Sequence, residues 1–124
     1  CPSGWVSYPG GKCYKFSTEK KTWADAQAFC QSLGAHLASI HSEEENDFLL
    51  SLLKNSNSDY YWIGLSRPDS NGSWQWSDGS GPVDYSNWAP GEPGGSGNCV
   101  VLSTSGGGKW NDVSCTSKLP FICE

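Results

Sequence analysis

The chain has 124 residues, and its 13 Asp and Glu against 8 Lys and Arg give a formal net charge of −5. This acidic balance argues against nucleic acid as a partner, because phosphate binding needs a clustered basic surface. No run of about 18 apolar residues is present in the sequence, so no segment is predicted to insert into a membrane. The 7 Trp give a chain with only 17% charged residues enough bulk to fold around an aromatic core.

Six cysteines in so short a chain favour disulfides and an oxidising, extracellular compartment. A cysteine zinc site is the alternative, and the lack of any C-x-x-C pair argues against it. Because the chain begins at Cys1 without a charged-then-apolar leader, we expect a secreted protein after processing or an extracellular module of a longer one. Its length is typical of one domain, predicted over residues 1–124.

Helical periodicity runs through residues 14–55 and predicts two helices. The first begins after Thr22, an N-cap with Asp25 three residues later, and ends at Gly34, a typical C′ residue. Its apolar face consists of Trp23, Ala26, Phe29, Cys30 and Leu33. The segment 35–40 that follows is predicted to be extended.

A second helix is predicted after Ser42, which has Glu45 three residues later in a capping-box pattern. Its first turn is acidic, with Glu43, Glu44 and Glu45, where the helix dipole favours anions. We interpret these three as a solvated first turn rather than as a metal or partner site. The buried stripe of this helix is predicted to be Phe48, Leu49, Leu52 and Leu53.

The second half is rich in loops, with short strands predicted at 60–65, 74–76 and 100–102, and residues 119–123 close the domain. Polar loops are predicted at 55–59, 83–97 and 103–108, and the length of the second is typical of a functional segment. Four tryptophans are interpreted as core residues, with sugar stacking by one of them as the alternative: Trp62, Trp74, Trp76 and Trp88.

Five features of the sequence occur together. They are the six-cysteine layout, the segment 34–40 before the Glu-rich helix, Trp62-Ile63-Gly64-Leu65, Glu92-Pro93, and Trp110-Asn111-Asp112 before Cys115. On these features essentially the whole chain resembles a long-form C-type lectin-like domain. The resemblance implies an α+β fold, with two helices flanking small antiparallel sheets, a long irregular binding-loop region and three disulfides.

Six cysteines alone leave their pairing open. The resemblance implies one N-terminal hairpin disulfide, one between the first helix and the last strand, and one that braces the binding loops: Cys1–Cys13, Cys30–Cys123 and Cys99–Cys115.

In family members that bind sugar, a calcium ion bridges the protein and two vicinal hydroxyls. The resemblance implies ligands from a Glu-Pro-Asn segment, a Glu before the fourth cysteine, and the Trp-Asn-Asp motif. The matching ligands here are Glu92, Asn111 and Asp112, and the peptide bond to Pro93 is implied to be cis. These are the oxygen donors that calcium requires.

Two positions depart from that pattern, since Gly94 replaces the Asn and Gly97 replaces the Glu. With the Asp112 carbonyl and two sugar hydroxyls, the shell reaches only about six oxygens, the lower end of the calcium range. We therefore expect one weak calcium site at most, filled best with sugar bound, and Asn98 is a candidate substitute ligand.

The auxiliary calcium site of some relatives is expected to be absent. Its acidic positions correspond to Arg67, Asn71 and Gly95, which leaves Asp69 as the nearby carboxylate.

The predicted function is a carbohydrate-binding module for microbial or cell-surface glycans in innate recognition, with the Glu-Pro form resembling mannose-type members. The ligand-binding residues would be Glu92, Asn98, Asn111 and Asp112. The alternatives are a protein- or surface-binding member without sugar chemistry, and calcium-independent glycan binding through loops 94–98 and 103–108.

Three further patterns bear on other possible sites. Asn71-Gly72-Ser73 is an N-glycosylation sequon on a predicted loop. His36 and His41 have a spacing that zinc ligands also show, and we interpret them as structural. No Ser-His-Asp or Cys-His arrangement is expected, so the chain is not predicted to be an enzyme.

Overall fold

The chain is described here by a computed structural model, which covers residues 1–54, 56, 58–69, 71–94 and 97–124. The five other residues, Asn55, Asn57, Ser70, Gly95 and Ser96, lie outside the described residues. Parts of the predicted loops 55–59, 83–97 and 94–98 therefore carry no structural description here.

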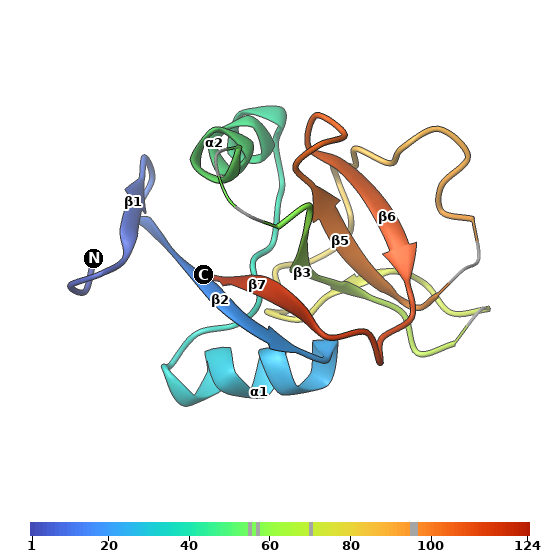
Figure 1. Ribbon diagram of the computed structural model, residues 1–124, viewed down its shortest axis with the longest axis horizontal. Helices are drawn as coiled ribbons and strands as arrows, with labels where there is room; N and C mark the ends of the chain where they lie inside the picture. The colour runs from blue at the N-terminus through green and yellow to red at the C-terminus, as the bar shows by residue number, and fades with distance from the viewer. Residues whose placement is uncertain (55, 57, 70, 95–96) are drawn as a thin grey trace.

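Two helices and a mixed sheet make up the described structure, which confirms the predicted α+β class (Figure 1). In chain order the elements are β1 (Val6–Tyr8), β2 (Lys12–Lys21), α1 (Trp23–Ser32), α2 (Glu43–Leu53), β3 (Tyr60–Ser66), β4 (Gln75–Trp76), β5 (Cys99–Ser103), β6 (Lys109–Val113) and β7 (Leu119–Cys123). The strand order is β1-β2-β7-β3-β5-β6, with β4 paired to β3. The sheet is antiparallel except where β3 runs parallel to β7.

The N-terminal segment corrects the sequence analysis. Residues 14–21, included there in the helical region, belong to β2, which pairs with β1 and then with β7. The pairing with β7 joins the two ends of the chain, and Lys15 lies opposite Cys123. Cross-strand pairing thus decides the conformation of a segment whose Lys and Glu content is common in helices.

Both helices begin as predicted. The Thr22 hydroxyl accepts the Asp25 backbone N–H at 3.3 Å, and the Ser42 hydroxyl accepts the Glu45 N–H at 3.2 Å. Gly34 follows α1 with φ of 78°, the left-handed conformation that ends many helices. No described helix has the length and apolar character needed to cross a membrane.

The first turn of α2 is not solvated throughout, which corrects a second expectation. Glu45 is only 7% exposed, and its Oε2 accepts hydrogen bonds from Lys12 and from the Tyr14 hydroxyl. Burial would raise the pKa of Glu45, but the bond from Lys12 and the His41 N–H outweigh it and hold that pKa below its usual value. Glu45 therefore ties α2 to β2 as an ion.

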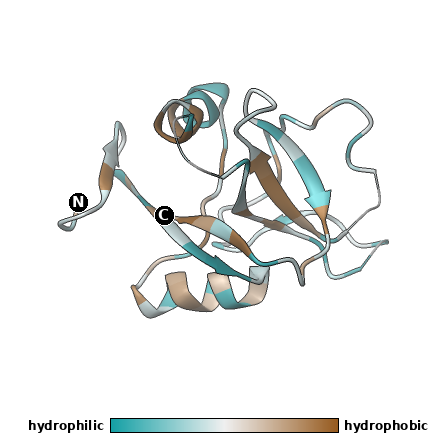
Figure 2. Ribbon diagram, viewed as in Figure 1, coloured by the Kyte–Doolittle hydropathy of each residue, from teal (hydrophilic) through white to brown (hydrophobic). Residues whose placement is uncertain are grey.

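The core contains the larger side chains of the central strands. Trp62, Trp110 and Phe121 are fully buried, and Trp76 is 4% exposed. Figure 2 shows the same pattern, with hydrophobic residues along β5 and β7 and more hydrophilic ones along β6. Trp74 and Trp88 are partly buried and pack against the core, so all four tryptophans singled out from the sequence contribute to it.

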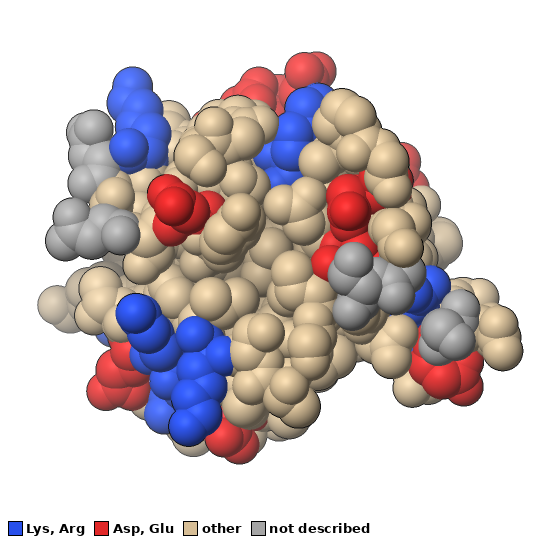
Figure 3. Space-filling view, turned by 45° about the vertical axis from the view of Figure 1, so that its right-hand side comes forward, with Lys and Arg blue, Asp and Glu red and all other residues tan. Residues whose placement is uncertain are grey.

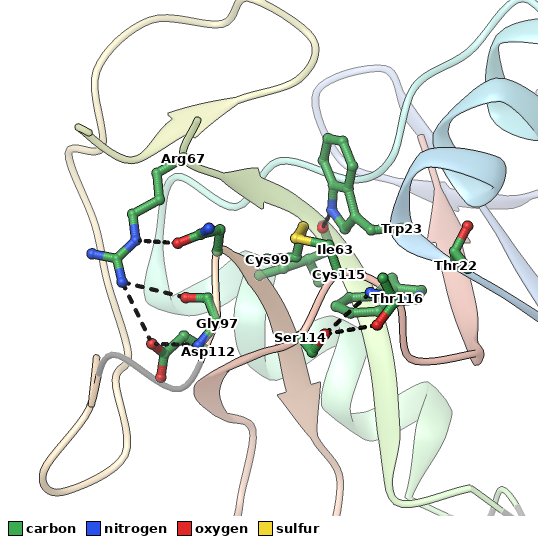
Figure 4. The surroundings of a disulfide bond; sticks show 12 residues. Thr22, Trp23, Ile63, Arg67, Gly97, Cys99, Asp112, Ser114, Cys115 and Thr116 are labelled. Atoms are coloured by element: carbon green, nitrogen blue, oxygen red, sulfur yellow. Dashed lines mark hydrogen bonds and ion pairs between the residues drawn. A yellow bond between two sulfur atoms is a disulfide. The ribbon is translucent and has the colours of Figure 1, made fainter. Parts of the chain in front are cut away.

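Three disulfides join the pairs that the resemblance implied: Cys1–Cys13, Cys30–Cys123 and Cys99–Cys115. The second connects α1 to β7 across 93 positions of sequence. The third connects the start of β5 to the loop after β6, next to the segment that carries the candidate site (Figure 4).

Candidate functional site

The irregular segment after β4 is fixed to β6 by backbone hydrogen bonds. Trp110 N–H donates to Asn87 O at 2.8 Å, and Ala89 N–H donates to Trp110 O at 3.0 Å. A turn follows, in which Glu92 N–H donates to Ala89 O at 2.9 Å. These bonds bring Glu92 back to β6, two residues beyond Trp110, where Asp112 lies.

Glu92 and Asp112 meet directly. Glu92 Oε2 accepts the Asp112 backbone N–H at 3.0 Å, and Asp112 Oδ1 accepts the Gly94 N–H at 3.0 Å. The peptide bond between Glu92 and Pro93 is cis, as the resemblance implied. The adjacent Asp112 carboxylate, together with partial burial, raises the pKa of Glu92 above its usual value. Two like charges so close favour a cation between or beside them.

Arg67, at the end of β3, supplies one such cation. Its Nη2 lies 3.9 Å from Asp112 Oδ2 and donates to Gly97 O at 3.3 Å, and its Nε donates to Asn98 Oδ1 at 3.1 Å. The Arg67 side chain is 11% exposed and that of Asp112 is fully buried. Figure 4 shows the arginine extended from the strand end toward Gly97 and Asp112.

The other two predicted ligands have different surroundings. Asn98 is half-buried, and its amide oxygen already accepts the bond from Arg67. Asn111 lies on the half-buried side of β6, where the burial alternates from Trp110 to Asp112. Among the described residues no hydrogen bond joins the Asn111 amide to either carboxylate. Of the four predicted site residues, the structure thus brings Glu92, Asp112 and, through Arg67, Asn98 together.

The two glycines that the sequence comparison with the family assigned to ligand positions, Gly94 and Gly97, differ in the space around them. A Cβ at Gly97 would lie 1.9 Å from Val113 O and 2.5 Å from Ser114 N, which backbone atoms cannot accommodate. A Cβ at Gly94 would lie 3.1 Å from Glu92 Oε1, the end of a flexible side chain. A side chain can therefore be introduced at Gly94. At Gly97 no side chain fits, because the Gly97 backbone packs directly against the backbone of Val113 and Ser114.

A polar contact in the core supports the site from below. Asn46 is fully buried on α2, where its Oδ1 accepts Trp110 Nε1–H at 2.8 Å and its Nδ2 donates to Gly108 O at 3.1 Å. Trp110 also packs edge-on against Trp88, whose ring lies 5.3 Å from that of Trp74. The sequence analysis did not identify Asn46, because nothing in its local pattern marks it as buried.

His41 makes contacts that the sequence analysis did not expect. Its Nδ1 lies 2.8 Å from Asp84 Oδ1, and its Nε2 lies 2.7 Å from Ser80 Oγ. The side chains of a Ser and an Asp thus both lie within contact distance of one His, and the expectation that no such arrangement occurs is wrong.

The chemistry of this arrangement differs from that of a catalytic triad. The Ser80 backbone N–H, the donor best placed for an oxyanion, instead donates to Asp78 Oδ1 at 2.9 Å. Burial would raise the pKa of Asp78, but hydrogen bonds from Ser80 and others lower it, so this neighbour is an anion that repels a developing oxyanion. Asp84 is 59% exposed rather than buried as the orienting acid of a triad is. The contacts of His41 with Ser80 and Asp84 are therefore interpreted as structural.

The remaining candidates lie in separate places. The ring of His36 contacts Gln27 at 2.9 Å, so the two histidines have different partners. No cluster of three His, Cys, Asp or Glu suited to a metal occurs among the described residues. Asn71 is exposed in a turn where its N–H donates to Asp69 Oδ1 at 2.8 Å, and Gly95 lies outside the described residues.

A shallow pocket of about 240 Å³ lies near the opposite end of β3 from Arg67, at the start of that strand. Lys20, Tyr60 and Lys118 are among its lining residues, together with Asp59. Figure 3 shows charged side chains of both signs in separate groups, with mostly uncharged surface between them. The described surface in that view has no continuous basic face of the kind that binds nucleic acid.

A family model described as "Lectin C-type domain" matches residues 19–124. The chain belongs to the C-type lectin family. A lactose-binding lectin of Anguilla japonica is 46% identical over 129 residues, which cover 99% of this chain and 76% of that protein. The low affinity immunoglobulin epsilon Fc receptor of Mus musculus is 44% identical over 128 residues, all of this chain but 37% of the receptor. The chain thus spans a little over a third of that relative.

Solved structures with this fold include a carbohydrate-recognition domain and an antifreeze protein. The cow C-type carbohydrate-recognition domain of CD23, solved with an oligosaccharide, is 43% identical with a TM-score of 0.86, covering 99% of this chain and 93% of that one. A calcium-independent type II antifreeze protein is 36% identical with a TM-score of 0.85, covering 99% and 92%. The C-type lectin fold is therefore shown, and only the first of these two descriptions names a carbohydrate.

Proposed function

We propose that residues 1–124 form one extracellular lectin domain that binds glycans at the face carrying Glu92 and Asp112. The observation that supports this most is the meeting of the two carboxylates, which come from segments 20 residues apart and are joined by the Asp112 N–H to Glu92 bond. Relatives described as lactose-binding or solved with an oligosaccharide support glycans as the ligand class. The Glu92-Pro93 form favours mannose-type sugars, and recognition of microbial or cell-surface glycans is the biological role that we infer.

The candidate residues offer the type of oxygen ligand that calcium prefers, but fewer ligands than calcium needs. Carboxylate and amide oxygens of Glu92, Asp112 and Asn111 are hard ligands of the type that calcium prefers. Three side chains fall well short of about six to eight ligands, and Arg67 already faces Asp112. We propose that these three residues hold one weak calcium ion, which supplies positive charge for two sugar hydroxyls. The protein's own part is to hold Glu92 in place through the Asp112 and Gly94 N–H groups.

We infer that the chain is not an enzyme. The Ser80–His41–Asp84 contacts lack a free oxyanion donor at Ser80, as the Asp78 carboxylate accepts it. The Anguilla japonica and Mus musculus relatives are described as a lectin and a receptor.

The test is retention of the chain on immobilised mannan in calcium, followed by a chelator. We expect retention in calcium, elution by the chelator, and at least about tenfold weaker binding of Glu92→Gln, because a carboxylate next to a divalent ion contributes more than about 1.4 kcal/mol. Glu44→Gln, at an exposed position in the first turn of α2, removes the same charge elsewhere and should bind as the parent does. Gly94→Asn should strengthen retention, since the neighbouring Glu92 side chain can move aside.

Three results would contradict parts of this proposal. Retention that a chelator leaves unchanged would argue for calcium-independent glycan binding. Failure to bind any of a panel of glycans would favour a protein- or surface-binding role. An equal loss of mannan retention in Glu92→Gln and Glu44→Gln would show that the glycan does not bind at the face carrying Glu92 and Asp112.

A further inference from the structure

Arg67 lies where a positive charge acts on the candidate calcium ligands. Its guanidinium is 11% exposed and 3.9 Å from the carboxylate of Asp112, whose side chain has no exposed surface. A carboxylate buried in this way needs a cation or several donors to remain charged. The Gly94 and Gly97 N–H groups donate to Asp112 at 3.0 and 3.4 Å, and the Arg67 guanidinium brings a full positive charge to within 3.9 Å of the same carboxylate.

We propose that Arg67 is a built-in counter-ion that takes over the charge compensation a bound calcium ion would give Asp112. Two consequences follow. The backbone at Gly94, Gly97 and Asn98 keeps its structure without metal, and calcium binds more weakly because a fixed cation already faces its ligand. The inference concerns the same site as the proposed function and rests on it for the position of the calcium ion.

Several contacts hold the guanidinium in place, so it does not move away freely when a second cation arrives. The Arg67 backbone N–H donates to Asn98 O at 2.9 Å, which sets the register between the end of β3 and the start of β5. Its Nε and Nη2 then bind Asn98 Oδ1 and Gly97 O. The planar group also lies 4.5 Å from the ring centre of Trp74. Only arginine offers this combination of a rigid fork and a stacking face.

The charges explain the direction of the effect on calcium. Glu92 and Asp112 carry two negative charges, and Arg67 cancels one of them. A divalent ion would therefore meet a cluster with one net negative charge and a guanidinium beside it. Interactions between partly buried charges at this range are screened little by salt, so the repulsion persists at physiological ionic strength.

The experiment measures calcium affinity by calorimetry for the parent chain, Arg67→Gln and Lys54→Gln. Lys54 is an exposed cation at the end of α2 and serves as the matched control for net charge. We expect Arg67→Gln to bind calcium about tenfold or more tightly than the parent, with Lys54→Gln unchanged. In a chelator, Arg67→Gln should melt at a lower temperature than the parent and recover most of the loss in millimolar calcium.

A second measurement uses the unaltered chain, so the test does not depend on the folding of a variant. Hydrogen exchange at the Gly94, Gly97 and Asp112 amides should be equally slow in chelator and in millimolar calcium. Calcium-dependent protection of these amides, or calcium affinity in Arg67→Gln no higher than in the parent, would overturn the proposal. If calcium affinity responds as expected but mannan retention fails, the proposed function is wrong and the counter-ion role of Arg67 stands.

Discussion

Replacing Asp112 with Asn is expected to abolish calcium-dependent glycan retention and to destabilise the chain by about 2–3 kcal/mol. The Asp112 side chain is fully buried, and the change leaves the Arg67 guanidinium 3.9 Å from a neutral amide. The amide oxygen can still accept the Gly94 N–H, as Asp112 Oδ1 does in the parent chain. Its NH2 group would then face two donors, the Gly97 N–H and the Arg67 guanidinium, where the carboxylate oxygen accepts.

The measurement pairs urea unfolding with mannan retention. Asp47→Asn is the control, because Asp47 is an exposed acid on α2 and should change the free energy of unfolding by less than about 0.5 kcal/mol. An Asp112→Asn chain as stable as the control would show that Asp112 has no structural role in the loop. Full mannan retention by Asp112→Asn would show that the Asp112 carboxylate is not part of the binding site.

The largest effect on stability is expected when the Cys30–Cys123 disulfide is removed by the double change to Ala. The disulfide closes a loop of 93 positions, so loop entropy alone corresponds to about 4–5 kcal/mol in the unfolded-chain model. Both cysteines are essentially buried between α1 and β7, so lost packing adds to this figure. A chain of this size is marginal without its disulfides, and we expect the variant to be largely unfolded at 37 °C.

The control is removal of Cys1–Cys13, which closes 12 positions at the exposed N-terminal hairpin. The same model gives about 3 kcal/mol for this shorter loop, and little of the core is disturbed. Chemical unfolding followed by tryptophan fluorescence compares the two variants. Equal losses of stability from both would contradict the assignment of Cys30–Cys123 as the main covalent constraint on the fold.

Local signals predicted the parts of the fold that local chemistry decides. The helix starts at Thr22 and Ser42 follow from hydroxyl caps whose partners lie three residues away. The apolar runs of β3 and β5 predicted their strands, because each is buried on both faces, whereas the last strand, β7, was implied by the family resemblance. The strands β2 and β6 were missed, since their polar and charged residues carry no clear apolar alternation and pairing with β7 and β5 decides their conformation.

The candidate site was predicted only in part, for the same reason. The motifs around Glu92 and Asp112 marked both carboxylates, and the fold brings them together. Arg67 was interpreted from the sequence as the loss of an acidic ligand in the auxiliary site. Its contact with Asp112 depends on the register between Arg67 and Asn98, which lie 31 residues apart. Likewise, Glu45 was assigned to solvent because its partner Lys12 lies 33 residues away on β2.

The most direct test of the account is an amide NMR titration of the chain with a soluble mannoside in calcium. The account predicts that the largest shifts occur at the N–H groups of Gly94, Gly97 and Asp112, beside Glu92 and Arg67, and that they vanish in Glu92→Gln. Shifts that instead gather around Lys20, Tyr60 and Lys118, which line the pocket at the start of β3, would contradict it.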